Sequence, residues 1–334
     1  MSKAVCGVNG FGRFGLHLLN YYLESEDKSK FEIKFINDEI LDINRALDII
    51  VHDPYVQIYK NFQVRIEGDL LVFNDTHKIR YTNNKTEDIS WLGSPDIFLE
   101  CTGKFTDAEI AREFKTGNTK KVLISATSLN ADKTLVYGFN HLEYTDADDV
   151  ISYGSCTVNA YVPLTSYLDT TFKVLSSDVN VIHNIPEYQL KDGCIETPGL
   201  PRVPLLRKGC TLSNVAPKLL DCVEDVNFNV NYTLIPYTGV SMIDFRYELE
   251  SSISEDFWKM IEKSCLDGDL KGLYAIQEED NGPQEHQNTQ FSSILIKDNS
   301  YIRDNNLYLH AYFDNENSVN RYFDLTNFIS SKIS

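Results

Sequence analysis

The 334-residue sequence lacks an uninterrupted apolar run of about 20 residues, the length that crosses a bilayer as a helix. Its start, residues 1–12, also lacks the basic region followed by a long apolar stretch that marks a secretory signal. Apolar residues make up 42% of the chain and charged residues 24%, which are the proportions of a soluble globular protein. We therefore expect a cytoplasmic protein that does not insert into a membrane.

An excess of positive charge and a pattern of paired cysteines are absent as well. The formal net charge of −18 repels phosphate backbones and anionic lipids, so we expect neither nucleic acid nor a membrane surface as a partner. A local basic pocket for one small anion stays compatible with this charge. The seven cysteines are scattered, with neither a CxxC pair nor nearby histidine spacing, so we expect no disulfide framework and no metal site.

The chain is longer than a domain with a single hydrophobic core usually is, so its length predicts two domains. Before residue 152, strands alternate with helices, a pattern typical of an α/β fold with a doubly wound sheet. After residue 152, a helix over 156–170 is followed by longer alternating strands at 177–183, 227–235 and 240–249, which favour an antiparallel sheet. The elements expected in the first part are strands at 3–8, 31–36, 62–67, 70–74, 97–100, 122–125 and 135–138, and helices at 13–24, 42–50 and 107–115.

Three glycines, Gly10, Gly12 and Gly15, form a GxGxxG pattern between the first strand and the first helix. Alone this is a weak signal, because a glycine-rich turn gives the same pattern. In this context the glycines let a pyrophosphate approach the backbone at a helix N-terminus. Asp38 ends the second strand, where a carboxylate accepts ribose hydroxyls and repels a 2′-phosphate, although a capping or turn aspartate is the alternative. Together these residues predict dinucleotide binding, with NAD favoured over NADP.

Cys156 stands at a strand-to-helix junction, and His183 ends a later strand. A helix N-terminus favours the thiolate and lowers the pKa of a thiol, and its exposed N–H groups can hold a developing oxyanion. A histidine within reach would act as the base. A buried structural cysteine and a structural histidine are the alternatives for either residue alone, but the pair favours nucleophilic catalysis.

These residues belong to a longer set that resembles the glyceraldehyde-3-phosphate dehydrogenase family over nearly the whole chain. The interval of 27 residues between Cys156 and His183 matches the family. The other segments that carry the resemblance are residues 8–15, 36–38, 100–105, 125–126, 155–157 and 313–316, with Asn159 and Arg321.

The resemblance implies oxidation of an aldehyde by Cys156 as nucleophile and His183 as base, with hydride transfer to NAD and release of the acyl group by phosphate. It implies a homotetramer and two domains. These are a Rossmann-type NAD-binding domain (1–152, joined by a C-terminal helix 315–334) and an α+β catalytic domain (153–314) with a large, mostly antiparallel sheet. Asn315 is expected to hold the nicotinamide carboxamide. The residues implied around NAD are Gly10, Phe11, Gly12, Arg13, Phe14, Asp38, Thr102, Ser125 and Asn315.

The two anion sites of the family are altered in this sequence. Pro186 stands in place of a threonine and Leu234 in place of an arginine, and neither side chain can bind phosphate. The family's Ser-Thr-Gly appears as residues 212–214, and the aromatic and glycine residues expected after residue 316 are replaced in 317–319. We expect a long, proline-rich loop over residues 186–211. Its cations Arg202, Arg207 and Lys208 are candidates to rebuild an anion site, or are ordinary solvated charges. The residues expected at the substrate are Ser155, Thr157, Arg202, Arg207 and Ser213.

Three functions remain open. The first is an NAD-dependent aldehyde dehydrogenase for a small-molecule aldehyde other than the glycolytic one, with its acyl-enzyme released by water or another acceptor. The second is a divergent phosphorylating glyceraldehyde-3-phosphate dehydrogenase. The third is an NAD-binding regulatory protein without catalysis, against which the presence of both Cys156 and His183 argues.

Overall fold

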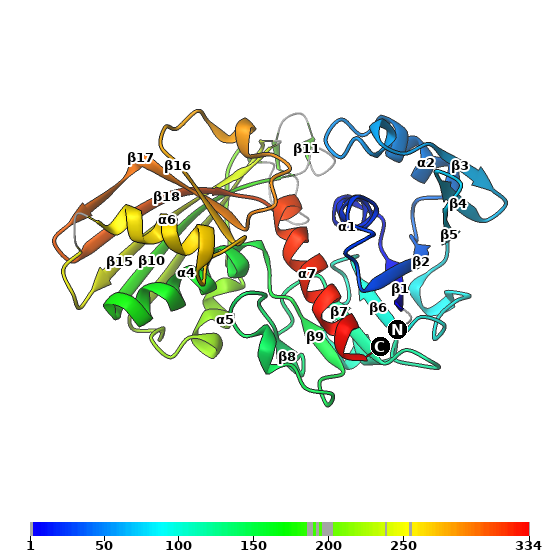
Figure 1. The fold of residues 1–334 in the computed structure, drawn as a ribbon, viewed down its shortest axis with the longest axis horizontal. Coiled ribbons are helices and arrows are strands. Elements are labelled where there is room, and N and C mark those ends of the chain that lie inside the picture. Colours follow the sequence, from blue (N-terminus) through cyan, green and yellow to red (C-terminus); the bar gives the residue numbers. More distant parts are fainter. Residues whose placement is uncertain are drawn as a thin grey trace. The chain divides into compact units, whose positions relative to one another are not determined.

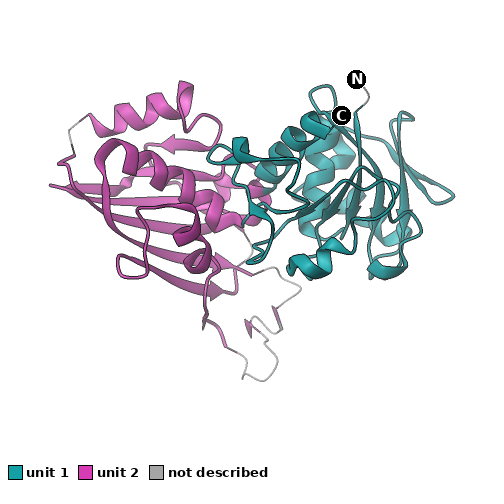
Figure 2. Cartoon of the chain, turned by 90° about the horizontal axis from the view of Figure 1, so that it is seen from below, with its two compact units in different colours: residues 1–154, 319–334 teal, residues 155–318 magenta. Residues whose placement is uncertain are grey.

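The computed structural model describes residues 3–185, 190–191, 194–195, 203–237, 239–253 and 256–333. The chain divides into two compact units, shown in different colours in Figure 2. Unit 1 comprises residues 1–154 and 319–334, and unit 2 comprises residues 155–318. Strand β9 (Val150–Ser152) ends at residue 152, where the sequence predicts the domain boundary, and the two units divide after residue 154.

Unit 1 is built on a nine-stranded sheet within the described residues, in the order β3-β4-β5-β2-β1-β6-β7-β9-β8. The strands from β5 to β8 in this order are parallel, and β3 and β4 form an antiparallel edge. This arrangement confirms the doubly wound fold. The other strands are β1 (Ala4–Asn9), β2 (Phe31–Asn37), β3 (Val64–Glu67), β4 (Leu70–Phe73), β5 (His77–Thr82), β6 (Ile97–Glu100), β7 (Lys121–Ile124) and β8 (Lys133–Thr134).

Helices cover both faces of this sheet. The apolar side of α1 packs with β1, β2 and the C-terminal part of α7, where Tyr322 lies 5.2 Å from Phe14 between ring centroids. On the opposite face α3 packs over Trp91 and Phe98. Burial of each such side chain contributes roughly 1.5–3 kcal/mol. The helices of this unit are α1 (Arg13–Glu24), α2 (Ile43–His52), α3 (Ala108–Arg112) and part of α7 (Asn315–Ile333), with 3₁₀ turns at Ile58–Lys60, Thr86–Asp88 and His141–Glu143.

The strand expected over residues 135–138 is wrong, because the chain turns there. The Asn140 side chain closes the turn by donating to the Thr134 carbonyl at 3.0 Å and accepting from the Val136 N–H at 2.8 Å. Leu135 and Val136 are nevertheless fully buried, which accounts for the strand-like apolar signal.

Unit 2 contains a seven-stranded, mostly antiparallel sheet among the described residues, in the order β13-β14-β10-β15-β18-β17-β16. Only the pairs β10–β14 and β16–β17 within it are parallel. The strands are β10 (Val174–Asn184), β13 (Leu206–Arg207), β14 (Phe228–Ile235), β15 (Ser241–Leu249), β16 (Tyr274–Gln277), β17 (Ser293–Arg303) and β18 (Asn306–Phe313), with a separate pair β11 (Leu190–Lys191) and β12 (Cys194–Ile195).

The helices of unit 2 are α4 (Cys156–Phe172), α5 (Leu212–Leu219) and α6 (Phe257–Asp267), with a 3₁₀ turn at Pro283–His286. Figure 1 shows α4 and α6 along one side of the large sheet. The ring of Tyr161 in α4 stacks near Phe245 and Tyr247, so α4 covers the face from which these side chains extend. Along β10 from Ser177 the buried residues alternate with exposed or half-buried ones, and His183 belongs to the buried set. The sheet therefore presents His183 on the same face as α4. Within the described residues, no helix is long and apolar enough to cross a membrane.

Candidate active site

Cys156 is the first residue of α4, and Ser155 caps the helix. The Ser155 backbone is extended (φ −152°, ψ 175°), and its hydroxyl accepts a hydrogen bond from the Val158 N–H at 3.3 Å. The backbone N–H groups of Cys156 and Thr157 interact with the Cys156 sulfur. No acidic side chain lies in the first turn of this helix. Negative charge on sulfur, or on an oxygen bound next to it, is therefore stabilised here.

His183 is the hydrogen-bond partner of this thiol. Its Nε2 lies 3.6 Å from Cys156 Sγ, and its Nδ1 lies 2.7 Å from the backbone carbonyl oxygen of Asn184. Because a carbonyl oxygen only accepts, Nδ1 must carry the hydrogen, and the lone pair of the neutral ring is then on Nε2. The backbone thus fixes the tautomer in which His183 can accept the thiol proton.

The environment keeps both partners neutral before reaction. Burial raises the pKa of Cys156, and the two backbone N–H groups only partly oppose this effect. Burial also lowers the pKa of His183 below its ordinary value. The expectation that the helix N-terminus lowers the pKa of Cys156 is therefore wrong for this structure, since desolvation outweighs it. A thiol and an imidazole face each other, and the proton can move when sulfur attacks.

The segment that joins β18 to α7 lies beside the pair. The Phe313 ring is 5.8 Å from the His183 ring between centroids and edge-on to it. The negative charge of Asp314 contributes to the raised pKa of Cys156, and that of Glu316 acts on His183 in the opposite sense to burial. Asn315, expected at the nicotinamide, belongs to this segment, and its side chain is exposed.

Two further residues lie near the pair: Cys210, which has no clear signal in the sequence, and Lys208, one of the three candidate loop cations. Cys210 Sγ lies 3.7 Å from Thr157 Oγ1, whose other contact is the Ser155 hydroxyl at 3.0 Å. The positive charge of Lys208 lowers the pKa of His183 and of Cys210, which places this cation nearby. Loop 186–211 has little periodicity, so only the fold shows that its end reaches the nucleophile.

The remaining candidates for substrate binding are dispersed. Arg207 is paired with Thr233, which places its side chain on the sheet face opposite His183, and its guanidinium donates to Asn231 at 3.3–3.4 Å. Ser213 is exposed at the start of α5 and donates to the Cys210 carbonyl at 2.7 Å. Pro186 and Arg202 lie outside the described residues. Of the loop cations with a described position, Lys208 and not Arg207 lies by the pair.

The glycine turn of unit 1 has the shape required for a pyrophosphate. Gly10 has a φ of +101°, and a Cβ there would lie 2.7 Å from the Thr102 nitrogen. A Cβ on Gly15 would lie 2.1 Å from the Gly10 oxygen, whereas one on Gly12 would meet nothing within 4 Å. Gly12 caps α1 without a side-chain acceptor, and the first turn has no acidic residue, so the positive helix end suits an anion.

The other residues expected around NAD are arranged around this turn. The Asp38 carboxylate accepts from the N–H groups of Phe11 (2.7 Å), Ile40 (2.8 Å) and Leu41 (2.9 Å), which leaves Oδ2 able to accept once more. The side chain of Arg13 turns to Asp53, and the Phe14 ring packs on Tyr153 and Tyr322. Only the backbone of residues 13 and 14 therefore suits a role at the phosphates.

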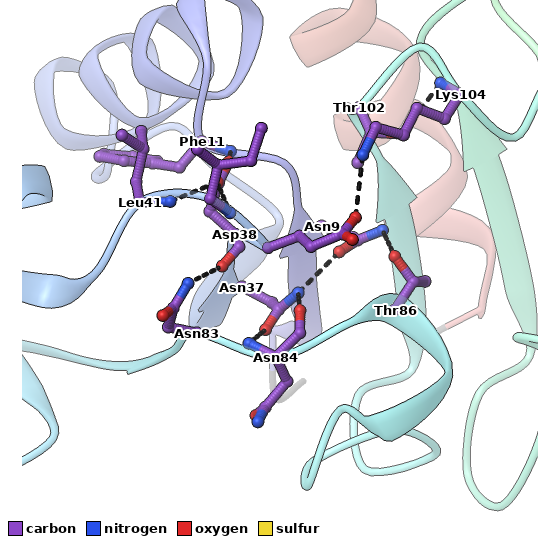
Figure 3. A network of polar contacts seen from close by, with 12 residues as sticks. Asn9, Phe11, Asn37, Asp38, Leu41, Asn83, Asn84, Thr86, Thr102 and Lys104 are labelled. Carbon is purple, nitrogen blue, oxygen red and sulfur yellow. Dashed lines mark hydrogen bonds and ion pairs between the residues drawn. The ribbon is translucent and has the colours of Figure 1, made fainter.

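Thr102 and Ser125 follow strands β6 and β7 at the same edge of the sheet. Figure 3 shows Thr102, Asn9, Asn37 and Asp38 in the same region, where their strands end. The Ser125 N–H donates to the Glu100 carbonyl at 2.9 Å. Ligands of doubly wound sheets bind at this carboxyl edge, so the residues present fit a dinucleotide.

Comparisons with known proteins cover both units of the chain. The family model described as "Glyceraldehyde 3-phosphate dehydrogenase, NAD binding domain" matches residues 4–108. Glyceraldehyde-3-phosphate dehydrogenase 2 of Caenorhabditis briggsae is 31% identical over 99% of this chain and 100% of its own length. Glyceraldehyde-3-phosphate dehydrogenase of Geobacillus stearothermophilus is 28% identical over 98% of each chain.

The chain belongs to the glyceraldehyde-3-phosphate dehydrogenase family. In this family member unit 1 contains the NAD-binding domain, and NAD is the cofactor. At about 30% identity, the family's NAD-dependent dehydrogenase character is shared, while the substrate is not fixed by the relationship. Among the residues whose positions are described, no group of three or more His, Cys, Asp or Glu side chains could hold a metal ion.

Proposed function

We propose that this family member is an NAD-dependent aldehyde dehydrogenase that acts through Cys156 and His183 on an aldehyde other than glyceraldehyde 3-phosphate. The chemistry rests on the 3.6 Å contact between Cys156 Sγ and His183 Nε2, with the Nδ1 hydrogen held by the Asn184 carbonyl. A scaffold that only bound NAD would need neither this pair nor its fixed tautomer.

In the proposed reaction, Cys156 Sγ adds to the aldehyde carbon while its proton passes to His183 Nε2. The N–H groups at the start of α4 stabilise the oxyanion that forms, and the imidazolium returns a proton as the thiohemiacetal develops. NAD, when bound, would supply the oxidant that accepts the hydride of the thiohemiacetal carbon, while the hydroxyl proton passes to His183 Nε2 and an acyl-thioester is left on Cys156. After His183 releases this proton to solvent, its Nε2 accepts a proton from the attacking water or other acceptor and returns it to the departing Cys156 sulfur as the thiol.

The choice of a different aldehyde rests on Leu234. This half-buried side chain is in register with His183 on the next strand, where the family resemblance predicts an arginine. A hydrocarbon side chain has no donor for a phosphate oxygen, and loss of a charge-assisted hydrogen bond costs about 1.5–3 kcal/mol. An uncharged aldehyde therefore fits this position better than a triose phosphate.

Lys208 supports one alternative. Its charge acts on both His183 and Cys210, so an anionic group on the substrate has a possible partner near the pair. In that case the protein is a divergent phosphorylating glyceraldehyde-3-phosphate dehydrogenase, and Lys208 takes the role of the arginine that the family resemblance predicts in place of Leu234.

The deciding experiment is NADH formation at 340 nm with phosphorylated and unphosphorylated aldehydes, each with and without inorganic phosphate. The proposal expects turnover of an unphosphorylated aldehyde that is lost in Cys156→Ser. Phosphate-dependent turnover of glyceraldehyde 3-phosphate would establish the alternative, especially if Lys208→Met abolished it. If Cys156→Ser retained full activity with any substrate, the assigned nucleophile would be wrong.

We further propose that the protein is a cytoplasmic homo-oligomer, as the resemblance implies. Light scattering coupled to size-exclusion chromatography tests the assembly. A mass equal to one 38.2 kDa chain at all concentrations would contradict it.

A further inference from the structure

Glu100 is a fully buried carboxyl group at the end of β6, and it is surrounded by hydrogen-bond donors. Its Oε1 accepts from the Thr102 N–H at 2.7 Å and from the Thr102 hydroxyl. Its Oε2 accepts from Asn9 Nδ2 at 2.8 Å. All three contacts use the carboxylate as an acceptor, so the ionised form satisfies every one of them.

The Asn9 side-chain amide cannot exchange its oxygen and nitrogen positions, because its orientation is fixed by Asn37 and, through Asn37, by the Asn84 backbone. The Asn84 backbone donates to Asn37 Oδ1 at 3.1 Å and accepts from Asn37 Nδ2 at 3.0 Å, so the Asn37 amide has one possible orientation. Asn37 Nδ2 also donates to Asn9 Oδ1 at 3.0 Å. Asn9 Nδ2 must therefore point at Glu100.

A second contact fixes the same direction. Trp91 Nε1, which can only donate, lies 2.9 Å from Thr82 Oγ1, and the Thr82 hydroxyl donates to Asn37 Oδ1 at 2.8 Å. Each residue therefore donates a hydrogen bond to the next, in the order Trp91, Thr82, Asn37, Asn9 and Glu100. A glutamine at residue 100 would have only one side-chain oxygen to accept these bonds. Its Nε2 would therefore face either Asn9 Nδ2 or the donors of Thr102.

This network connects the three strand ends that form the proposed cofactor site. Asn9 precedes Gly10, Asn37 precedes Asp38, and Glu100 lies two residues before Thr102. Backbone bonds reinforce the connection, since the Gly10 N–H donates to the Asn37 carbonyl at 2.8 Å and the Cys101 N–H donates to the Asn9 carbonyl at 2.7 Å. The Gly10 turn is thus held by hydrogen bonds of Asn9 and Asn37, and this set of bonds includes one ionisable group, the Glu100 carboxyl.

We propose that Glu100 is a positioning residue for NAD. Its carboxylate form holds the Gly10 turn and the Thr102 loop in the arrangement that binds the cofactor, and its protonation weakens NAD binding. A proton on Oε2 would face the Asn9 amide, and a proton on Oε1 would force the Thr102 hydroxyl to turn away. The inference concerns NAD binding by unit 1 and does not depend on the proposed aldehyde chemistry.

The surroundings place this protonation near neutral pH. Burial raises the pKa of Glu100 to about 7, against the opposing effects of Thr102, Asn9 and Lys104. The other ionisable groups that interact with it are Lys104 in the following loop, Cys101 beside it and Tyr322 on α7. The pKa values of all three are raised, so Lys104 stays charged and the thiol and phenol stay neutral near pH 7. Glu100 is the member of this set that changes charge there.

Calorimetric titration of the full chain with NAD, in two buffers of different ionisation enthalpy, counts the protons released on binding. At pH 7 we expect the wild type to release about half a proton, and this release should vanish by about pH 8.5. NAD affinity should fall about tenfold per unit below pH 6. Glu100→Gln should release no proton in this range and bind NAD about tenfold more weakly at pH 8, because one amide donor would then face another.

Thr86→Val is the matched control, since it removes a hydroxyl that bonds to Asn9 but leaves the carboxyl group in place. It should retain the proton release. The same proton release in Glu100→Gln as in the wild type would overturn the proposal. If Glu100→Gln does not fold, the wild type alone decides, because equal NAD affinity at pH 5.5 and pH 8 would also overturn it.

Discussion

His183 and Leu234 are in register on the adjacent parallel strands β10 and β14, so their side chains extend from the same face of the sheet. Leu206 of β13 is paired with Leu234 from the other side. The position next to the proposed base is thus occupied by hydrocarbon, whereas the nearby cation, Lys208, comes from the loop that follows β13. This relationship separates the proposed nucleophile and base, whose residue types match the family pattern, from the proposed substrate-binding positions, whose residue types differ from it.

Leu234→Arg should therefore improve the use of phosphorylated aldehydes. A guanidinium at this position offers paired donors to a phosphate, and we expect the KM for glyceraldehyde 3-phosphate to fall by about tenfold or more. Steady-state kinetics with phosphorylated and unphosphorylated aldehydes measure the change. Leu234→Met, which keeps the volume and adds no charge, is the control. An equal KM in the arginine and methionine variants would show that this position does not contact the substrate.

His183→Asn should lower kcat by about 10²–10⁴-fold, the usual contribution of a general base. Because the lowered pKa keeps His183 neutral at pH 7, the wild type at saturating NAD should keep its activity at neutral pH and lose it only in more acidic solution. Alkylation of Cys156 by iodoacetamide should slow in parallel, while NAD affinity stays the same. A variant with unchanged alkylation rate and lower NAD affinity would assign His183 a structural role instead.

The parts of the site that the sequence predicts are those with local causes. The Gly10 turn, the start of α1 at Arg13 and the start of α4 at Cys156 each depend on residues close together in the chain, and the structure forms all three. The pairing of Cys156 with His183, which are 27 residues apart, is predicted by the family resemblance and not by any local pattern.

What the sequence does not predict depends on pairing between distant segments. Arg207 and Lys208 are neighbours, yet the phase of the two-residue strand β13 places Arg207 on the face opposite His183. A shift of one residue would exchange them, and such a short strand has no periodicity from which to infer its phase. Glu100 likewise has no signal as an ionisable group near neutral pH, because its burial results from the packing of three strand ends.

Asp38→Asn should weaken discrimination between NAD and NADP. The carboxylate can accept a ribose hydroxyl through Oδ2 and repels a 2′-phosphate, whereas an amide has no charge and only one acceptor. We expect the ratio of NADP to NAD dissociation constants to fall by about tenfold, measured by titration calorimetry. Asp42→Asn is the control, since Asp42 caps α2 through Asn44 and Arg45. An equal effect of both substitutions would mean that Asp38 acts only on the local backbone.

The raised pKa of Glu100 also predicts how the stability of unit 1 depends on pH. An unfolded glutamate has a pKa near 4.5, whereas the folded group titrates at about 7, so the folded protein binds more protons between these values. The stability that this group contributes is therefore complete below about pH 4.5 and is lost as the pH rises through 7. Between pH 5.5 and 8.5 the loss is roughly 2 kcal/mol, calculated from 1.36 kcal/mol per pKa unit.

Trp91 makes this loss measurable within unit 1. It is buried and bonded to Thr82, and in a Trp258→Phe background it is the sole tryptophan of the chain. Urea unfolding of the NAD-free protein, followed by Trp91 fluorescence, should show a smaller decline from pH 5.5 to 8.5 in Glu100→Gln than in the parent. Equal declines would mean that Glu100 is ionised throughout this range. Because NAD is proposed to bind the carboxylate form, saturating NAD should reduce the decline in the parent, so the pH that favours binding is the one at which the free protein is less stable.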